Sequence, residues 1–230
     1  AAARELADHA ALGTPAEANL AQREVFWLLL AAKHAHAGYR HDAEAECLQR
    51  VVNHTAATQA QQRNALEDLA NCRSRAGRPQ EALAHFEALL ALGRQGGDPG
   101  LELAALNGMG QALRHLGRLA ESASVLLQAV ERARATGRID RLAVAAGMLG
   151  VLREHEGRTD EAAQWYEQSL AAARAANDRK SEELALGNHA NLHLVLRRHD
   201  QAMELYRQAL QIAVERGDLR TQGIWTGNIA

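Results

Sequence analysis

A glycine-arginine pair recurs every 40 residues along the middle of this chain. Gly77, Gly117 and Gly157 are each followed by arginine and, four residues after the glycine, by Glu-Ala or Glu-Ser. Arg197 begins a fourth copy that lacks the glycine, and Gly38 begins a fifth. A period of this length is the sequence signature of repeat architectures, in which each unit packs only on its neighbours.

Each unit contains two stretches with helical periodicity. In Leu103–Leu116 the apolar residues fall at helical spacing, which predicts a first helix, here called helix A. Residues 122–133 carry a second apolar stripe, which predicts helix B. The glycine between them suits the end of helix A, where a residue often takes a positive φ. Arg197 should therefore be strained or need a different turn.

The sequence thus predicts an all-α protein, a right-handed α-solenoid of antiparallel helix pairs. We expect about five full repeats, a leading helix B at Ala3–Leu12 and a trailing helix A that carries Trp225 and Ile229. An apolar last helix is unusual for a solenoid end. We therefore expect a single solenoid that is a fragment of a longer protein. The expected units are 1–23 (the end of a preceding repeat), 24–62, 63–102, 103–142, 143–182, 183–222 and 223–230 (the start of a further repeat).

Small residues recur where the two helices should approach each other, and large residues fill one fixed position of helix B. The small residues at the start of helix B are Ala82, Ser122, Ala162 and Ala202. The larger position holds Phe86, Leu126, Tyr166 and Tyr206, with Cys47 expected there in the earliest copy.

This pattern of small residues, turn glycine and helix-B aromatic resembles the tetratricopeptide repeat (TPR) family. The 40-residue unit is longer than the usual TPR and is similar to the Leu-Gly-Asn and kinesin-light-chain classes, a likeness carried by Leu186-Gly187-Asn188 and Gly227-Asn228. The resemblance runs from about Glu24 to the end of the chain.

The resemblance implies a concave groove, lined by the A helices, that holds a peptide or a partner helix. Asparagine and glutamine could pair with both backbone groups of an extended peptide. The alternative is a merely solvated polar face. Lysines of the kind that hold a terminal carboxylate are absent, since Glu67, Asp68, Ala104 and Gly108 stand there, so a mixed or amphipathic segment fits better. The expected groove residues are Asn64, Asp68, Asn71, Arg75, Asn107, Gln111, Arg114, His115, Met148, Val151, Glu154, His155, Leu184, Asn188, Asn191, Ile224 and Asn228.

No enzyme signature is found, and we expect no catalytic residue, no cofactor and no metal site. The glycine-rich segment 93–100 lies between two predicted helices without Gly-Lys-Ser/Thr, so we interpret it as a linker with Asp98 as helix cap. His189 and His193 have metal-ligand spacing, but His189 should pack against helix B. Cys47 and Cys72 are expected to be reduced thiols of a cytoplasmic protein.

The formal net charge of −2, without a basic stripe, argues against nucleic acid as a partner. No apolar run is long enough to cross a membrane. Two functions remain: an interaction scaffold for a protein or peptide, or a ligand- or peptide-sensing segment of a larger bacterial regulator or signalling ATPase. Self-association through the terminal helices is a third reading.

Overall fold

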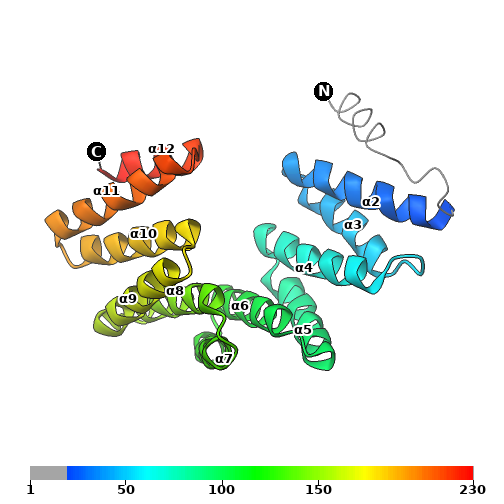
Figure 1. The fold of residues 1–230 in the computed structure, drawn as a ribbon, viewed down its shortest axis with the longest axis horizontal. Helices are drawn as coiled ribbons and strands as arrows, with labels where there is room; N and C mark the ends of the chain where they lie inside the picture. Colours follow the sequence, from blue (N-terminus) through cyan, green and yellow to red (C-terminus); the bar gives the residue numbers. More distant parts are fainter. Residues whose placement is uncertain (1–19, 230) are drawn as a thin grey trace. The chain divides into compact units, whose positions relative to one another are not determined.

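The computed structural model describes residues 20–229, and within this range the chain forms eleven helices and no strand (Figure 1). The predicted leading helix at Ala3–Leu12 lies outside the described residues. The chain divides into two compact units, the first ending at His85 and the second beginning at Phe86. Each unit is an array of antiparallel helix pairs, so the predicted all-α repeat solenoid is confirmed.

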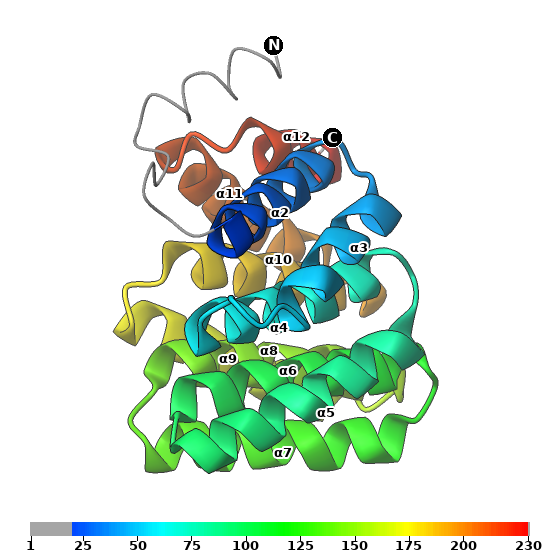
Figure 2. The same cartoon turned by 90° about the vertical axis from the view of Figure 1, so that its right-hand side faces the viewer.

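The first unit packs three helices and the start of a fourth, visible in blue and cyan in Figure 2. Its core is formed by Val25, Leu48 and Leu69, all almost fully buried. Thr58 and Gln61 form a reciprocal capping box at the start of its third helix. The helices are α2 (Leu20–Ala37), α3 (His41–Val52), α4 (Gln59–Arg75) and the first part of α5 (Pro79–Gly96).

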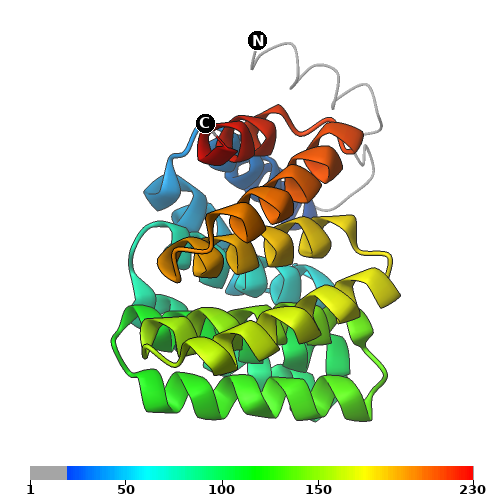
Figure 3. The same ribbon diagram turned by 90° about the vertical axis from the view of Figure 1, so that its left-hand side faces the viewer.

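In the second unit each helix from α6 to α11 packs on the next one along the chain, and α8 also contacts both α6 and α10 (Figure 3). The A-type helices therefore lie side by side, as the predicted solenoid requires. The helices are the rest of α5, α6 (Pro99–His115), α7 (Leu119–Ala135), α8 (Ile139–His155), α9 (Thr159–Ala175), α10 (Arg179–Val195), α11 (His199–Glu215) and α12 (Leu219–Ile229).

The turns inside the helix pairs follow the predicted chemistry, with one shift. Gly117 and Gly157 take φ values of 73° and 75°, and Arg197 is forced to 56°, the strain expected there. In the first copy the positive φ falls on Tyr39 and not on Gly38. The register of α3 is therefore one residue later than predicted. The large helix-B position belongs to Leu48 rather than Cys47, and Glu44 occupies the place that other repeats give to a small residue.

The turns between the pairs also use positive φ, at Gly97, Gly137, Asn177 and Gly217, which the sequence analysis did not foresee. The predicted linker at 93–100 is wrong in extent, because α5 continues to Gly96. Asp98 does cap α6, accepting a hydrogen bond from the Leu101 N–H. From α4 on, each A helix begins four residues before the expected repeat boundary, since these turns are short.

The last helix is covered on one side by its own chain. Trp225 is only 7% exposed, stacks on Tyr206, and donates its indole N–H to the buried Glu183 carboxylate at 2.8 Å. The expectation that Trp225 is available for self-association is therefore wrong, because its ring is part of the core. Of the apolar residues of α12, Ile224 and Leu219 remain exposed.

Of the helices between residues 20 and 229, none combines the length and the apolar character that crossing a bilayer requires. Both cysteines are free thiols, as expected, with Cys72 buried and Cys47 half-buried. Burial raises the pKa of the Cys72 thiol to about 11, so it stays protonated.

Candidate functional site

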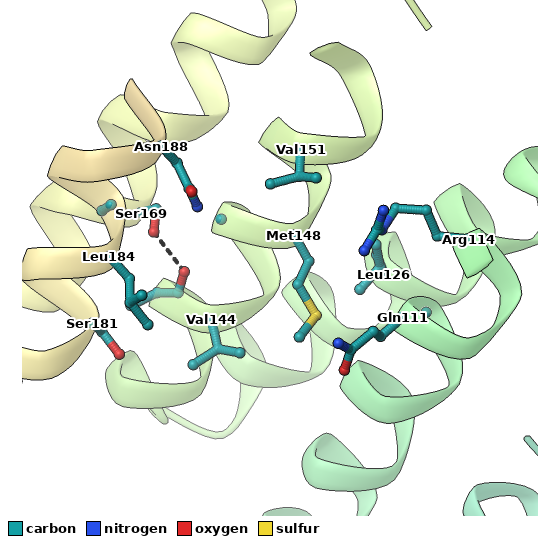
Figure 4. Close-up of a pocket in the computed structure, with 14 residues that line it drawn as sticks. Gln111, Arg114, Leu126, Val144, Met148, Val151, Ser169, Ser181, Leu184 and Asn188 are labelled. Atoms are coloured by element: carbon teal, nitrogen blue, oxygen red, sulfur yellow. Dashed lines mark hydrogen bonds between the residues drawn. The ribbon is translucent and has the colours of Figure 1, made fainter. Parts of the chain in front are cut away.

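A pocket of about 220 Å³ opens in the second unit on the surface formed by α6, α8 and α10 (Figure 4). Leu126 of α7 and Ser169 of α9, both B-type helices, form its floor. The lining residues are Gly110, Gln111, Arg114, Leu126, Ala143, Val144, Gly147, Met148, Val151, Ser169, Ser181, Leu184, Ala185 and Asn188.

Two glycines help to shape this pocket, because a Cβ at Gly110 would collide with its floor and a Cβ at Gly147 would crowd it. A Cβ at Gly110 would lie 2.5 Å from a methyl group of Leu126, and one at Gly147 would lie 3.1 Å from the Ser169 hydroxyl. Ser169 is held in place by donating to the Ala143 carbonyl at 2.7 Å. The absence of side chains at the glycines therefore lets the B helices approach the A helices closely.

The wall of the pocket is apolar. In Figure 4 the Met148 side chain lies at its centre, with Val144 and Val151 on the same helix and Leu184 opposite on α10. Leu184 is 49% exposed, although it is a large aliphatic residue. Methionine adapts its shape to a partner at low cost. This surface can therefore remove an apolar side chain of a ligand from water.

The rim carries polar groups that can fix a ligand. Arg114 contacts the neighbouring His115 ring nitrogen at 3.2 Å and, among the described residues, has no carboxylate as an ion-pair partner. Burial, together with the Arg114 charge, lowers the pKa of His115, which keeps this imidazole neutral near pH 7. Gln111, Ser181 and Asn188 add donors and acceptors. The rim thus offers one cation without an acidic partner beside an apolar surface.

Six of the predicted groove residues come together in this pocket: Gln111, Arg114, Met148, Val151, Leu184 and Asn188. The lining residues that the sequence analysis did not assign to the groove are Gly110, Leu126, Ala143, Val144, Gly147, Ser169, Ser181 and Ala185. Gly147 is the one with a visible signal, since it is a second glycine close to Gly150 within one helix.

Other predicted groove residues are engaged within their own helix pair. Glu154 accepts a hydrogen bond from the Tyr166 hydroxyl at 2.7 Å, and Asn191 accepts one from Tyr206. Asn107 is 4% exposed, and neither atom of its amide group has a hydrogen-bond partner. The remaining predicted residues of this unit, His155, Ile224 and Asn228, are exposed and lie outside the pocket.

The first unit has a separate pocket of about 330 Å³ between α2, α3 and α4, where Asp68, Asn71 and Arg75 meet as predicted. Arg75 is not free there, because it donates to the buried carboxylate of Glu44 at 2.7 Å. The predicted residue Asn64 is exposed and does not line this pocket.

The histidine pair of α10 is packed rather than open, as expected. The His189 ring contacts Tyr166 and stacks on His193 with a centroid distance of 4.8 Å. Burial lowers the pKa of both histidines. Packing against helix B therefore accounts for the position of His189.

These helix pairs and turns define a protein built from stacked helical repeats. The sequence model of the tetratricopeptide repeat matches residues 61–134 and 101–175, and a second model of the same repeat matches residues 185–220. The chain belongs to the tetratricopeptide repeat family. That family consists generally of non-enzymatic interaction scaffolds. No curated protein matches the chain.

Solved structures share the fold at low sequence identity. A Rap protein complexed with Competence and Sporulation Factor aligns with 87% of this chain and 57% of its own, at 13% identity and a TM-score of 0.76. A plasmid-encoded Rap conjugation gene regulator in complex with a Phr peptide aligns over 86% and 55%, at 10% identity and 0.74. The chain therefore spans little more than half the length of these two proteins.

A third structure places the same fold inside a signalling ATPase. The Signal Transduction ATPase with Numerous Domains from Pyrococcus horikoshii, which has a tetratricopeptide repeat sensor, aligns with 87% of this chain and 30% of its own, at 12% identity and a TM-score of 0.65. At these identities the likeness concerns the fold.

Proposed function

We propose that the second unit binds an extended protein or peptide segment across α6, α8 and α10. One bulky aliphatic side chain of the segment enters the apolar pocket, and an acidic side chain close to it pairs with Arg114. The observation that carries this proposal is an arginine at the rim of an apolar pocket that has no carboxylate partner among residues 20–229. A charge-assisted hydrogen bond beside a desolvated anchor is the usual source of binding energy in such grooves.

The amide groups at the rim supply the remaining contacts. Gln111 and Asn188 come from α6 and α10, on either side of α8, so they can pair with the backbone of a segment that crosses α8. The Rap structure with a Phr peptide supports a peptide as the occupant.

A second candidate function is a sensor segment within a larger regulator. The ATPase with a tetratricopeptide repeat sensor favours this context, because this chain aligns with only 30% of that protein. The two candidates share the same site and differ in what the binding controls. The open reading frame around this chain separates them: a nucleotide-binding or DNA-binding module supports the sensor, and further repeats alone support the scaffold.

The binding test uses fluorescent peptides with one leucine and one glutamate at varied spacing in a Gly-Ser background, with glutamine in place of glutamate as the matched probe. We expect Arg114→Glu to weaken the best glutamate peptide by about tenfold or more, the effect of losing roughly 1.5–3 kcal/mol. Arg207→Glu, at an exposed arginine of α11, makes the same charge change outside the pocket and should leave binding unchanged.

The apolar part of the site is tested separately. Val144→Trp should fill the pocket and abolish binding, whereas Leu127→Trp, at an exposed position of α7, should not. Equal binding of the glutamate and glutamine peptides, or full binding by Val144→Trp, would contradict the proposed site.

A further inference from the structure

Three side chains with metal-binding atoms converge in the first unit, beside the pocket of about 330 Å³ that Glu44 also lines. His41 is the first residue of α3, Glu44 lies one turn later, and Cys72 reaches them from α4. One ligand atom of each lies within 4.8 Å of the other two. The sequence analysis expected no metal site and did not consider these three residues together; Cys72 is 31 residues away from His41 along the chain.

Two of the three facing atoms of this cluster lack hydrogen-bond partners. The His41 Nδ1 and the Glu44 Oε2 are both buried without a hydrogen bond, and they lie 3.7 Å apart, within ion-pair distance and beyond hydrogen-bond distance. The Glu44 side chain is only 4% exposed. Two ligands that each bind one zinc ion at about 2.0–2.2 Å lie roughly 3.3–4 Å apart, so this separation suits a shared ion. The Cys72 thiol meanwhile donates to the His41 carbonyl at 3.2 Å.

The other oxygen of Glu44 is already held in place. Its Oε1 accepts from Arg75 at 2.7 Å and contacts the His36 ring nitrogen at 3.0 Å. Such outer contacts orient a carboxylate and leave its second oxygen available as a ligand. Arg75 thus places a positive charge beside the buried Glu44 carboxylate.

Repeat packing does not require this carboxylate. The corresponding residues of later helix pairs are Ala82, Ser122, Ala162 and Ala202, all small. They let helices A and B approach each other, and a buried glutamate there adds a charge that must be compensated. Its presence in this pair alone among those described, together with His41 and Cys72, indicates a local role.

We propose that His41, Glu44 and Cys72 bind a zinc ion through Nδ1, Oε2 and Sγ. Nitrogen, oxygen and thiolate donors in one cluster select Zn²⁺ over the hard cations Mg²⁺ and Ca²⁺. Three protein ligands leave a fourth coordination position for water. Binding converts the Cys72 thiol to a thiolate and releases its proton to solvent, so the affinity rises with pH.

The test uses the whole chain, freed of metal by a chelator and kept reduced, and titrated with Co²⁺ as a spectroscopic probe. We expect one equivalent of Co²⁺ to produce a sulfur-to-cobalt charge-transfer band, and Zn²⁺ to displace it. Cys72→Ser should abolish the band. Cys47→Ser is the matched control, since Cys47 lies on α3 outside the cluster, and it should retain the band.

A second variant keeps the proposal testable if Cys72→Ser fails to fold. His41→Ala changes a partly exposed residue at the start of a helix, and it should weaken Co²⁺ and Zn²⁺ binding by at least about tenfold while the helical circular dichroism is kept. Zn²⁺ should raise the melting temperature of the natural protein and of Cys47→Ser only. Absence of the band in the natural protein, its persistence in Cys72→Ser, or cobalt binding without sulfur character would overturn the proposal.

Discussion

At the scale of single residues, the helix pairs are assembled by placing a large ring or side chain over a glycine. A Cβ at Gly110 would collide with Leu126, and one at Gly187 would lie 2.2 Å from the Trp225 ring. At Gly150 the added atom would lie 2.4 Å from Tyr166. The bulky residue and the glycine are therefore complementary partners. The sequence predicted Leu126 and Tyr166 as the large residues of one helix-B position, but it did not predict that Trp225 packs over Gly187.

Gly150→Ala should destabilise the fold by about 1–3 kcal/mol, because Tyr166 cannot move aside without breaking its hydrogen bond to Glu154. Gly223→Ala is the control: this glycine is also helical, a Cβ there meets nothing within 4 Å, and the change should stabilise by about 0.5–1 kcal/mol. Urea unfolding of both variants measures the difference. Equal midpoints for the two would refute the packing argument.

At the scale of helices, α12 depends on a single anchor. Trp225 contributes its ring to the core with Tyr206 and its N–H to Glu183, while its neighbour Ile224 is 46% exposed. Glu183 is 1% exposed and also pairs with Arg216. The Trp225 N–H therefore supplies a second partner to this buried carboxylate. The remaining described residues of the helix, apart from the partly buried Ile229, contribute little to this core.

Trp225→Ala should release α12 from the helix pair before it. Removing a buried tryptophan costs about 3–5 kcal/mol, and here it also leaves Glu183 with one partner fewer. Amide hydrogen exchange should become faster throughout Leu219–Ile229. Ile224→Ala, on the exposed side of the same helix, should change exchange little. Unchanged protection of α12 in Trp225→Ala would show that other contacts hold it.

The sequence predicted the helices well because the 40-residue period and the apolar stripes are local signals. It placed the first turn one residue too early, since Gly38 is the obvious candidate for a positive φ and Tyr39 is not. It also found six pocket residues from their helix face. It could not foresee that Glu154 and Asn191 are taken by tyrosines of the partner helix, because that depends on how far two side chains reach in space.

At the scale of the whole molecule, several histidines are kept neutral by folding. Burial is the main cause of the lowered pKa of His85, His115, His189 and His193. The unfolded chain takes up protons near the ordinary value of 6.5 while the folded chain does not. Stability therefore falls as the pH drops below about 6.5. Arginine partners lower the pKa of carboxylates such as Glu121 and Glu156. These carboxylates become protonated, and lose their ion pairs, only at more acidic pH, where the stability of the fold decreases further.

His189→Leu should reduce this loss of stability. Leucine already occupies the corresponding position in α4 and α8, at Leu69 and Leu149, so the packing should tolerate it. The measurement compares the free energy of unfolding at about pH 8 and about pH 5.5. His155→Leu, at the exposed end of α8, should leave the difference close to that of the natural protein. A natural protein equally stable at both pH values would contradict the assignment.

Gly117 and Gly157 lie in the turns inside successive helix pairs and have nearly the same φ, 73° and 75°. The chain leaves both turns in the same direction relative to the preceding helix and enters helices α7 and α9 of equal length. Deleting residues 118–157 would therefore join Gly117 directly to Arg158, and α9 would replace α7 as the helix that pairs with α6. A variant of this protein that is one repeat shorter would therefore keep an existing turn and would need no new loop.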